Sequence, residues 1–380
     1  MNIYEIIQNK ILERLTESEA NGTKFHWVKP FDFTSSVRYP CNYETSKPYS
    51  GVNRLLPPDE YITFTKIQEM NQKDKSNFWH IRKGAKAAMV VYYNWQQAKD
   101  KDGNLLFDEE GNVRMIPYVK FFNVFDRSDI VNKDGDNLPS RIPVKHFSHD
   151  DIDRITQSEL LRFTSMVNYY CQEHGIELQI VTDSRRAYYS PSENIIRIPT
   201  MANFDSVYDY VHTVAHELAH STGIELGRFK NNSVETHEEY SKEELVAEIA
   251  ASMIIASFRI EDDSAHKDND IAYVQSWRKH IAESDTKKLI VAASQHAAKA
   301  SSLVTGVKLR EHYLETIAND ISEYENVPDF IRLDIEFSRE AVKANPLVWD
   351  MLNDEHREEL SDEIGDRVTV SNTLECIEDR

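Results

Sequence analysis

Hydrophobic and polar positions follow two different periods along the chain. Before residue 130 the apolar segments AMVVYYNW and YVKFFNVF are rich in β-branched and aromatic residues and predict strands, with a strand pair turning at Lys83 and Gly84. After residue 150, SVYDYVHTVAHELAHSTG and SKEELVAEIAASMIIASF repeat their apolar positions every three or four residues and predict long helices. The pattern therefore predicts an α+β protein, in which a small α+β domain precedes a mainly helical domain with a short β-sheet.

Polar, turn-forming sequence divides the chain further. The segment VNKDGDNLPSRIPVK has no hydrophobic period, so residues 131–149 are expected to link a first domain over 1–130 to a second over 150–305. Residues 306–380 hold 20 acidic residues against 8 basic ones and are expected to form an acidic helical appendage.

The chain shows no membrane or export signal in its hydrophobic pattern. No apolar run approaches the ~20 residues needed to cross a bilayer. The first residues, MNIYEIIQNKILERLTES, predict an amphipathic helix and lack the layout of a signal peptide. The three cysteines are far apart and form no CxxC pair, which argues against a disulfide framework. We therefore expect a cytoplasmic protein with no membrane partner.

The sequence HELAH at positions 216–220 is an HExxH motif. On a helix His216 and His220 lie on one face, so both can direct a ring nitrogen at one metal ion, while Glu217 lies about 100° away and can reach a metal-bound water. The motif also occurs by chance, and two helical histidines are more often ordinary surface or core residues. A third ligand is therefore needed to support a zinc site.

The helix that follows offers the third ligand. Glu244 and Glu248 share one face of the apolar stretch ELVAEIAASMII, and a buried carboxylate requires a cation or strong donors. Glu244 is predicted to be the ligand and Glu248 to accept a hydrogen bond from a histidine N–H. Glu243 is predicted to face solvent. The alternative is that Glu244 and Glu248 are both solvated glutamates.

Together these residues predict a zinc peptidase. Zinc would lower the pKa of a bound water and Glu217 would act as the catalytic base toward a peptide carbonyl. Tyr188, Tyr189 and His212 are candidates for stabilising the oxyanion. The segment at 193–199, ENIIRIP, is expected to be an edge strand that pairs with an extended peptide substrate.

Over roughly residues 1–303 the chain resembles the ArdC-type antirestriction proteins of plasmids and mobile elements. The resemblance lies in WVKPF, YSGVNRLL, YITF, RKG and FFNVF in the first half, and in YYSPSENIIRIP, HTVAHELAHSTG, EELVAEIAASM, YVQSW and AASQHAAKA in the second. It implies an N-terminal domain that binds single-stranded DNA and a C-terminal zincin-like metallopeptidase domain. It also implies His216, His220 and Glu244 as zinc ligands and Glu217 as the base.

The distribution of charge permits DNA binding by the first domain despite a net charge of −20. Residues 1–130 carry 18 basic and 17 acidic residues, which leaves a net charge of −21 on the remainder. Single-strand binding requires basic groups for phosphates and aromatic faces for bases. The residues alone favour a core role for most aromatics, whereas the resemblance favours DNA binding. The candidate contacts are Tyr49, Asn53, Arg82 and Lys83, within a set that also includes Trp27, Phe31, Tyr43, Trp79 and Tyr92.

Three functions remain open from the sequence. The first is an antirestriction-type protein that binds single-stranded DNA and cleaves an unidentified protein or peptide. The second is a peptidase effector whose first domain binds protein. The third is a DNA-binding protein with a structural metal site, although such a site has no need of a base such as Glu217.

Overall fold

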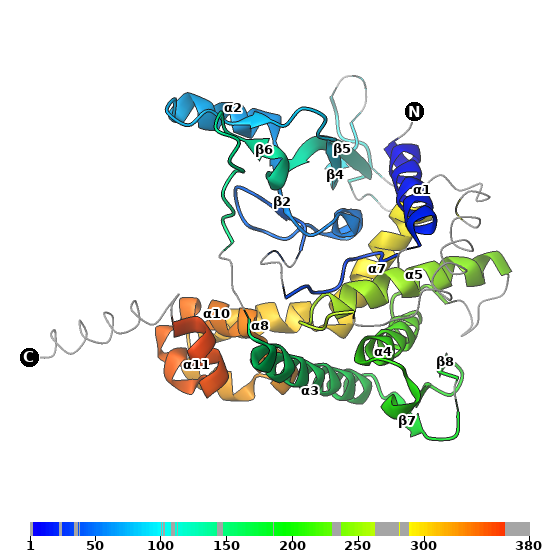
Figure 1. The fold of residues 1–380 in the computed structure, drawn as a ribbon. Coiled ribbons are helices and arrows are strands. Elements are labelled where there is room, and N and C mark those ends of the chain that lie inside the picture. Colours follow the sequence, from blue (N-terminus) through cyan, green and yellow to red (C-terminus); the bar gives the residue numbers. More distant parts are fainter. Residues whose placement is uncertain are drawn as a thin grey trace, which may run out of the picture. The chain divides into compact units, whose positions relative to one another are not determined.

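The computed structural model divides into two compact units (Figure 1). The first comprises Met1–His146 and His266–Gln295, and the second comprises Phe147–Ala265 and His296–Arg380. The residues that the structure describes are 3–22, 25–33, 37, 39–99, 101, 103–107, 111, 113–142, 147–184, 186–229, 237–262, 281 and 289–361.

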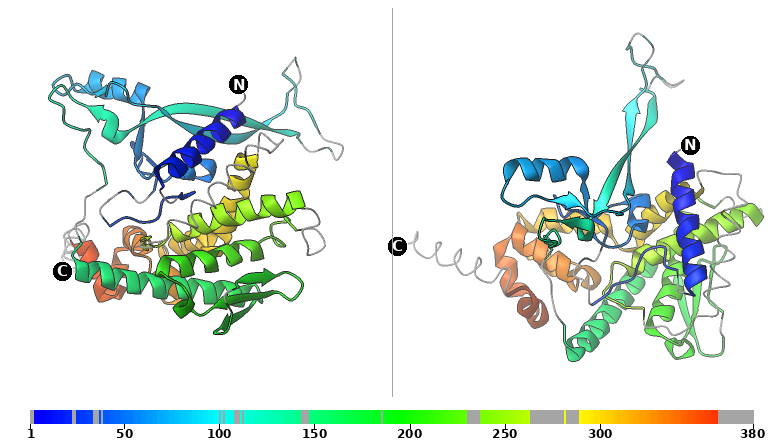
Figure 2. Two further views of the ribbon diagram at one scale, coloured as in Figure 1. Left: turned by 45° about the vertical axis from the view of Figure 1, so that its right-hand side comes forward. Right: turned by 45° about the horizontal axis from the view of Figure 1, so that its top comes forward.

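The first unit is built on a four-stranded sheet with the order β1-β2-β5-β4. β1 runs parallel to β2, and the other neighbours are antiparallel. The strands β4 and β5 pair over ten positions and form a long two-stranded ribbon (Figure 2). The elements up to this ribbon are α1 (Ile3–Asn21), β1 (Cys41–Asn42), η1 (Gly51–Leu55), β2 (Glu60–Thr63), α2 (Phe64–Lys73), β4 (Ala88–Gln97) and β5 (Met115–Asp126).

A second, two-stranded sheet pairs β3 (His80–Ile81) with β6 (Ile130–Val131), which follows η2 (Arg127–Asp129). The predicted strand pair at Lys83 and Gly84 is therefore wrong, because β3 and β4 belong to different sheets and each finds an antiparallel partner in distant sequence. The apolar residues between α2 and this sheet form a small core of Tyr43, Ile62, Ile67, Trp79, Ile130 and Leu138.

Much of the segment expected to link the domains belongs to the first unit. Leu138 is 1% exposed in the small core. Glu60 is fully buried and accepts hydrogen bonds from the Ser140 hydroxyl at 2.6 Å and the Arg141 backbone N–H at 2.9 Å. A linker beginning at residue 131 is thus corrected: the polar residues there form turns, and the buried side chains of Val131 and Leu138 anchor them to the first unit.

The second unit begins with α3 (His149–Glu173), whose N-terminus is closed by a capping box between Ser148 and Asp151. A three-stranded sheet follows, with the order β7-β9-β8. Its strands are β7 (Glu177–Val181), β8 (Tyr188–Ser190) and β9 (Ile195–Pro199), and η3 (Met201–Asn203) leads to the helices α4 (Val207–Ser221) and α5 (His237–Ile255). The helix α7 (Leu289–Val304) belongs to this unit from His296 onward. The expectation of an edge strand at 193–199 is wrong, because β9 is the central strand and β8 lies at an edge.

The C-terminal helices are not an appendage to the second unit. They are α8 (Val307–Ile317), η4 (Ile321–Asn326), α9 (Asp329–Arg332), α10 (Ile335–Ala344), η5 (Pro346–Met351) and α11 (Asp354–Leu360). Phe330, Phe337 and Leu360 from these helices lie in one continuous core with Phe163 of α3 and Leu218 of α4. The prediction of a separate acidic appendage over residues 306–380 is therefore corrected for the described residues. The helices there are amphipathic: their apolar faces join the core, and their acidic residues lie on the outer faces.

Buried ion pairs tie the same helices to the rest of the second unit. Glu159 of α3 is 2% exposed and pairs with Arg162 at 2.8 Å and with Arg259 at 2.9 Å. Arg259 also pairs with Glu359 of α11 at 2.9 Å. Within the described ranges, no helix is both long and apolar enough to cross a membrane.

Candidate metal centre

The helix α4 carries the HExxH motif and is well defined at both ends. The Ser206 hydroxyl accepts a hydrogen bond from the Asp209 backbone N–H at 3.0 Å and caps the first turn. At the other end, a Cβ on Gly223 would lie 2.6 Å from the ring of Phe229, so only glycine lets the following segment fold back against the helix.

The structure brings His216, His220 and Glu244 together, each partly buried. The two histidine Nε2 atoms are 3.0 Å apart. One carboxylate oxygen of Glu244 is 3.5 Å from His216 Nε2, and the other is 3.6 Å from His220 Nε2. One donor atom of each residue lies within 4.8 Å of the other two. Two imidazoles and a carboxylate in this arrangement fit a divalent cation with an open coordination position.

The other ring nitrogens face two further carboxylates on α5. His216 Nδ1 is 3.4 Å from Glu248, and His220 Nδ1 is 3.3 Å from Glu243. Each histidine therefore turns Nε2 toward Glu244 and Nδ1 toward a carboxylate of its own. Carboxylates in such positions fix the tautomer and the orientation of a ligating imidazole.

The prediction that Glu243 faces solvent is wrong, because its side chain is buried. Its carboxylate accepts two hydrogen bonds from the Arg228 guanidinium, both at 2.9 Å. Burial raises the pKa of Glu243, but His220 and Arg228 outweigh this effect and lower it below its usual value. Helical spacing places Glu243 about 100° from Glu244, away from the expected ligand face. This spacing gives no indication that Arg228, fifteen residues earlier in the chain, is the partner of Glu243.

Glu217 lies next to this cluster and is 8% exposed. Burial raises its pKa above the ordinary value, and the two histidines oppose that rise. Its carboxylate also accepts a hydrogen bond from the backbone N–H of Tyr189 in β8. A carboxylate with a raised pKa beside a cation site has the properties of a general base.

The predicted oxyanion-stabilising residues have different surroundings. The Tyr189 hydroxyl donates to Asn194 at 3.1 Å, and His212 Nε2 is 3.5 Å from Glu248, which also contacts His216. Tyr188 is exposed in β8. A further tyrosine, Tyr240, is 54% exposed and its hydroxyl hydrogen-bonds to Glu244, one helical turn away. Tyr240 could have been predicted from the sequence, because it lies four residues before Glu244, the expected third ligand, and therefore on the same helix face.

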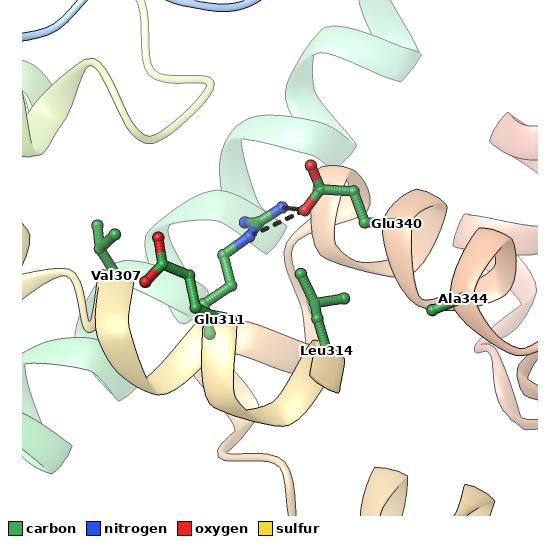
Figure 3. A pocket seen from close by; sticks show the side chains of 6 residues that line it. Val307, Glu311, Leu314, Glu340 and Ala344 are labelled. Atoms are coloured by element: carbon green, nitrogen blue, oxygen red, sulfur yellow. Dashed lines mark hydrogen bonds and ion pairs between the residues drawn. The ribbon is translucent and has the colours of Figure 1, made fainter. Parts of the chain in front are cut away.

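A separate shallow cavity of about 500 Å³ lies between α8 and α10 (Figure 3). Its lining includes the ion pair of Arg310 with Glu340, 2.9 Å apart. None of the residues of the metal cluster lines it, so the candidate chemistry lies elsewhere.

The candidate DNA contacts in the first unit differ in accessibility. Arg82 and Lys83 are exposed, and Arg82 donates to Asn137 at 2.8 Å. Tyr49 is partly buried against Tyr61, and burial raises its pKa to about 12. Asn53 is withdrawn as a contact: it is buried, and its amide both donates to and accepts from the Val91 backbone at 2.8 Å.

Other aromatic residues lie on the surface of the first unit. Trp27, Tyr43 and Trp79 are core residues. In contrast, Tyr92 of β4 and Phe122 of β5 are 49% and 46% exposed. Tyr92 pairs directly with Lys120, and Phe122 lies two residues further along β5, so these three side chains project from one face of the ribbon. Neighbouring Phe121 projects from the opposite face.

Comparison with known proteins finds a different match for each half of the chain. Residues 1–125 match the N-terminal domain of the anti-restriction factor ArdC, and residues 154–296 match a zincin-like metallopeptidase. Two curated relatives are DNA primases TraC of Escherichia coli, 26% and 27% identical over 302 and 287 residues, or 74% and 72% of this chain. These matches span only 18% and 25% of the primases. An uncharacterised protein, y4eC of Sinorhizobium fredii, is 22% identical over 77% of this chain and 89% of its own length.

Two solved structures are similar over most of the chain. Both are of the antirestriction protein ArdC from plasmid R388, one metal-free and one bound to Mn(II). They are 26% and 25% identical, with TM-scores of 0.52 and 0.50, and each match covers 80% of this chain and 97% of the other. The chain therefore belongs to the ArdC-type antirestriction proteins, with an ArdC N-terminal domain followed by a zincin-like metallopeptidase domain.

Proposed function

We propose that this protein is an antirestriction factor that binds single-stranded DNA through its first unit and hydrolyses peptides at a zinc site in its second unit. The observation that carries the peptidase assignment is the convergence of His216 Nε2, His220 Nε2 and the Glu244 carboxylate beside buried Glu217. A purely structural metal site would close its fourth position with another ligand and would not need a base.

The ligand set fits zinc. Two imidazoles and one carboxylate leave one position open in a tetrahedral site, which is a common arrangement in zinc peptidases. Imidazole donors suit zinc, whereas sites for manganese are usually richer in oxygen donors. The similarity to a Mn(II)-bound structure supports a divalent cation at this centre.

The chemistry divides between the cation and the side chains. A bound divalent cation supplies Lewis-acid activation of water and of the substrate carbonyl. The Glu217 carboxylate accepts the proton of the attacking water and passes it to the leaving amine. The Tyr240 hydroxyl donates its one proton to Glu244, and it would have to turn that proton from Glu244 to the carbonyl to stabilise the developing oxyanion.

An extended peptide is the substrate class that the sheet favours. β8 is an edge strand, and the Tyr189 backbone N–H points away from β9 to the Glu217 carboxylate. A peptide that paired with this edge would place its scissile carbonyl next to Glu217 and the histidines. The side chain of Tyr188 would contact such a peptide.

The test is metal analysis combined with hydrolysis of a peptide library by the intact protein. We expect about one zinc per chain, which the double variant His216→Ala, His220→Ala loses. Glu217→Gln should retain the zinc and the fold but lose hydrolysis by at least about 100-fold, because an amide cannot accept the proton. Tyr240→Phe should lower kcat with little change in KM. Metal retention by the double histidine variant would refute the site.

The DNA assignment rests on the surface of the β4–β5 ribbon. Tyr92 and Phe122 are exposed aromatic rings on the same face; Lys120 lies directly opposite Tyr92 and two residues from Phe122 on β5. Rings in such a position stack with unpaired bases, and a lysine next to both can neutralise a phosphate. Duplex DNA hides its base faces, so single strands should bind more tightly.

Fluorescence anisotropy with a labelled oligonucleotide tests this assignment on the full-length chain. The double variant Tyr92→Ala, Phe122→Ala should weaken single-strand binding by about 2–6 kcal/mol, since stacking contributes about 1–3 kcal/mol per base. Phe121→Ala is the matched control, because it removes an exposed ring from the other face of the same strand. Equal binding by all these proteins would refute the DNA face and favour a first unit that binds protein.

A further inference from the structure

We infer that Arg228 is a positioning residue for the metal centre, acting through Glu243 on the ring of His220. This inference rests on the proposed metal site and extends it to a residue that contacts none of the candidate ligands directly. It concerns the segment after α4, which neither helical spacing nor the HExxH motif connects to the metal.

Arg228 is held by contacts on three sides. Nε and Nη2 donate to the two carboxylate oxygens of Glu243, both at 2.9 Å. Nη1 donates to the Thr222 hydroxyl at 2.8 Å, and Nη2 also donates to the Ala219 carbonyl at 2.8 Å. The guanidinium therefore joins the C-terminal end of α4 to α5 in a fixed geometry, as a planar bidentate donor can.

The backbone of the intervening turn places Arg228 in this position. The backbone N–H of Arg228 donates to the Gly223 carbonyl at 2.7 Å, and that of Leu226 donates to the Thr222 carbonyl at 3.0 Å. Gly227 has a φ of 66°, in the region that glycine adopts readily. These features return the chain to the helix end within eight residues of His220.

The consequence for His220 follows from the position of Glu243. Its carboxylate is 3.3 Å from His220 Nδ1, where it is placed to accept an Nδ1–H, while Nε2 faces Glu244 and the cation site. Without Arg228, the carboxylate would be buried without its cationic partner and free to rotate. The imidazole would then lose its fixed tautomer and orientation.

The two histidines are supported differently. Glu248, which faces His216 Nδ1, has His212 at 3.5 Å as a further partner, whereas Glu243 has a permanently charged arginine. Loss of Arg228 or Glu243 should weaken metal binding although the three candidate ligands stay in place.

A double-mutant cycle on the full-length protein tests this inference. Zinc affinity is measured by competition with a chromogenic chelator for wild type, Arg228→Ala, Glu243→Gln and the double variant. We expect each single variant to bind zinc about 10- to 100-fold more weakly, the usual effect of losing such a carboxylate partner. The double variant should be no weaker than the weaker single variant, because both changes remove the same link.

The visible absorption of bound Co²⁺ provides a second measurement, since it responds to the geometry of the histidine donors and not to global stability. It should change in Arg228→Ala and Glu243→Gln. Glu340→Gln is the matched control, because Glu340 of α10 also accepts from an arginine at 2.9 Å, Arg310 of α8, but is not part of the metal cluster (Figure 3). Its affinity and spectrum should equal those of wild type.

The outcomes separate the two proposals. A wild-type protein that binds no metal would refute the proposed site itself. Metal binding by wild type with unchanged affinity and Co²⁺ spectrum in both single variants would overturn the positioning role alone. Multiplicative losses in the double variant would also overturn it, because Arg228 and Glu243 would then act independently. If Arg228→Ala fails to fold, Glu243→Gln tests the link from its other end.

Discussion

Asp59 and Asp126 meet at the end of the first unit's sheet, where β2 begins and β5 ends, and they share a hydrogen bond. Burial and the neighbouring Asp126 charge raise the pKa of Asp59 from 3.8 to about 7. Since this pKa is raised by folding, the protonated pair stabilises the native state. That contribution is fully present below pH 3.8 and is lost as the pH rises through about 7.

The expected size of this effect follows from the pKa. One pKa unit corresponds to ~1.4 kcal/mol, so the rise to about 7 corresponds to roughly 4 kcal/mol for a fully desolvated group. Because the pair is partly exposed, solvent screening reduces this to about 2 kcal/mol. Asp59→Asn removes the charge repulsion and should abolish this part of the pH dependence.

The assay is urea unfolding at pH 5 and pH 8, followed by tryptophan fluorescence. Among the described side chains, Trp27 and Trp79 are buried in the first unit and Trp349 lies in the second, so a Trp349→Phe background removes the second unit's described tryptophan from the signal. Asp126→Asn should flatten the pH dependence as Asp59→Asn does, because the proton belongs to the pair. The loss begins at pH 3.8, so only part of the total of about 2 kcal/mol falls between these two pH values. A loss in both variants equal to that of wild type would refute the reasoning.

Three further predictions concern the second unit. Glu159→Gln leaves two buried guanidinium groups without their shared carboxylate and should reduce the free energy of unfolding by about 3–5 kcal/mol, measured by urea unfolding. Gly223→Ala forces a Cβ against the ring of Phe229 and should cost about 1–3 kcal/mol in thermal unfolding, together with weaker zinc binding because Arg228 follows that turn. Phe337→Ala should cost about 3–5 kcal/mol, and a cost below about 1 kcal/mol would contradict its place in the core.

The sequence predicted those parts of the structure that depend on local spacing. The α+β class follows from the change of hydrophobic period, and the i, i+4 spacing of His216 and His220 places them on one face. The surroundings of Glu243 could not be predicted, because a charged residue in a helix is buried only when a distant partner arrives. Arg228 is that partner, and it reaches Glu243 through a turn that no periodicity describes.

Long-range pairing explains the other differences. Asn53 was expected to be an exposed polar residue. Its side-chain amide instead pairs with the backbone of Val91 in β4, a contact that sequence spacing does not reveal. The order β7-β9-β8 reverses the sequence order of the last two strands, so the central strand could not be identified from hydrophobicity alone. Acidic composition likewise concealed the apolar inner faces of α8–α11.

The pairing of Arg259 with Glu359 has a consequence for how the chain is made. Glu359 lies 100 positions after Arg259 in the sequence, and its helix α11 is the last helix among the described residues. During translation, the segments that carry the histidines leave the ribosome well before α11 does. Until then, Arg259 has only Glu159 of its two carboxylate partners, and the apolar faces toward α10 and α11 remain exposed on the nascent chain, where they can bind chaperones or aggregate. The candidate metal centre should therefore mature only after α11 has left the ribosome.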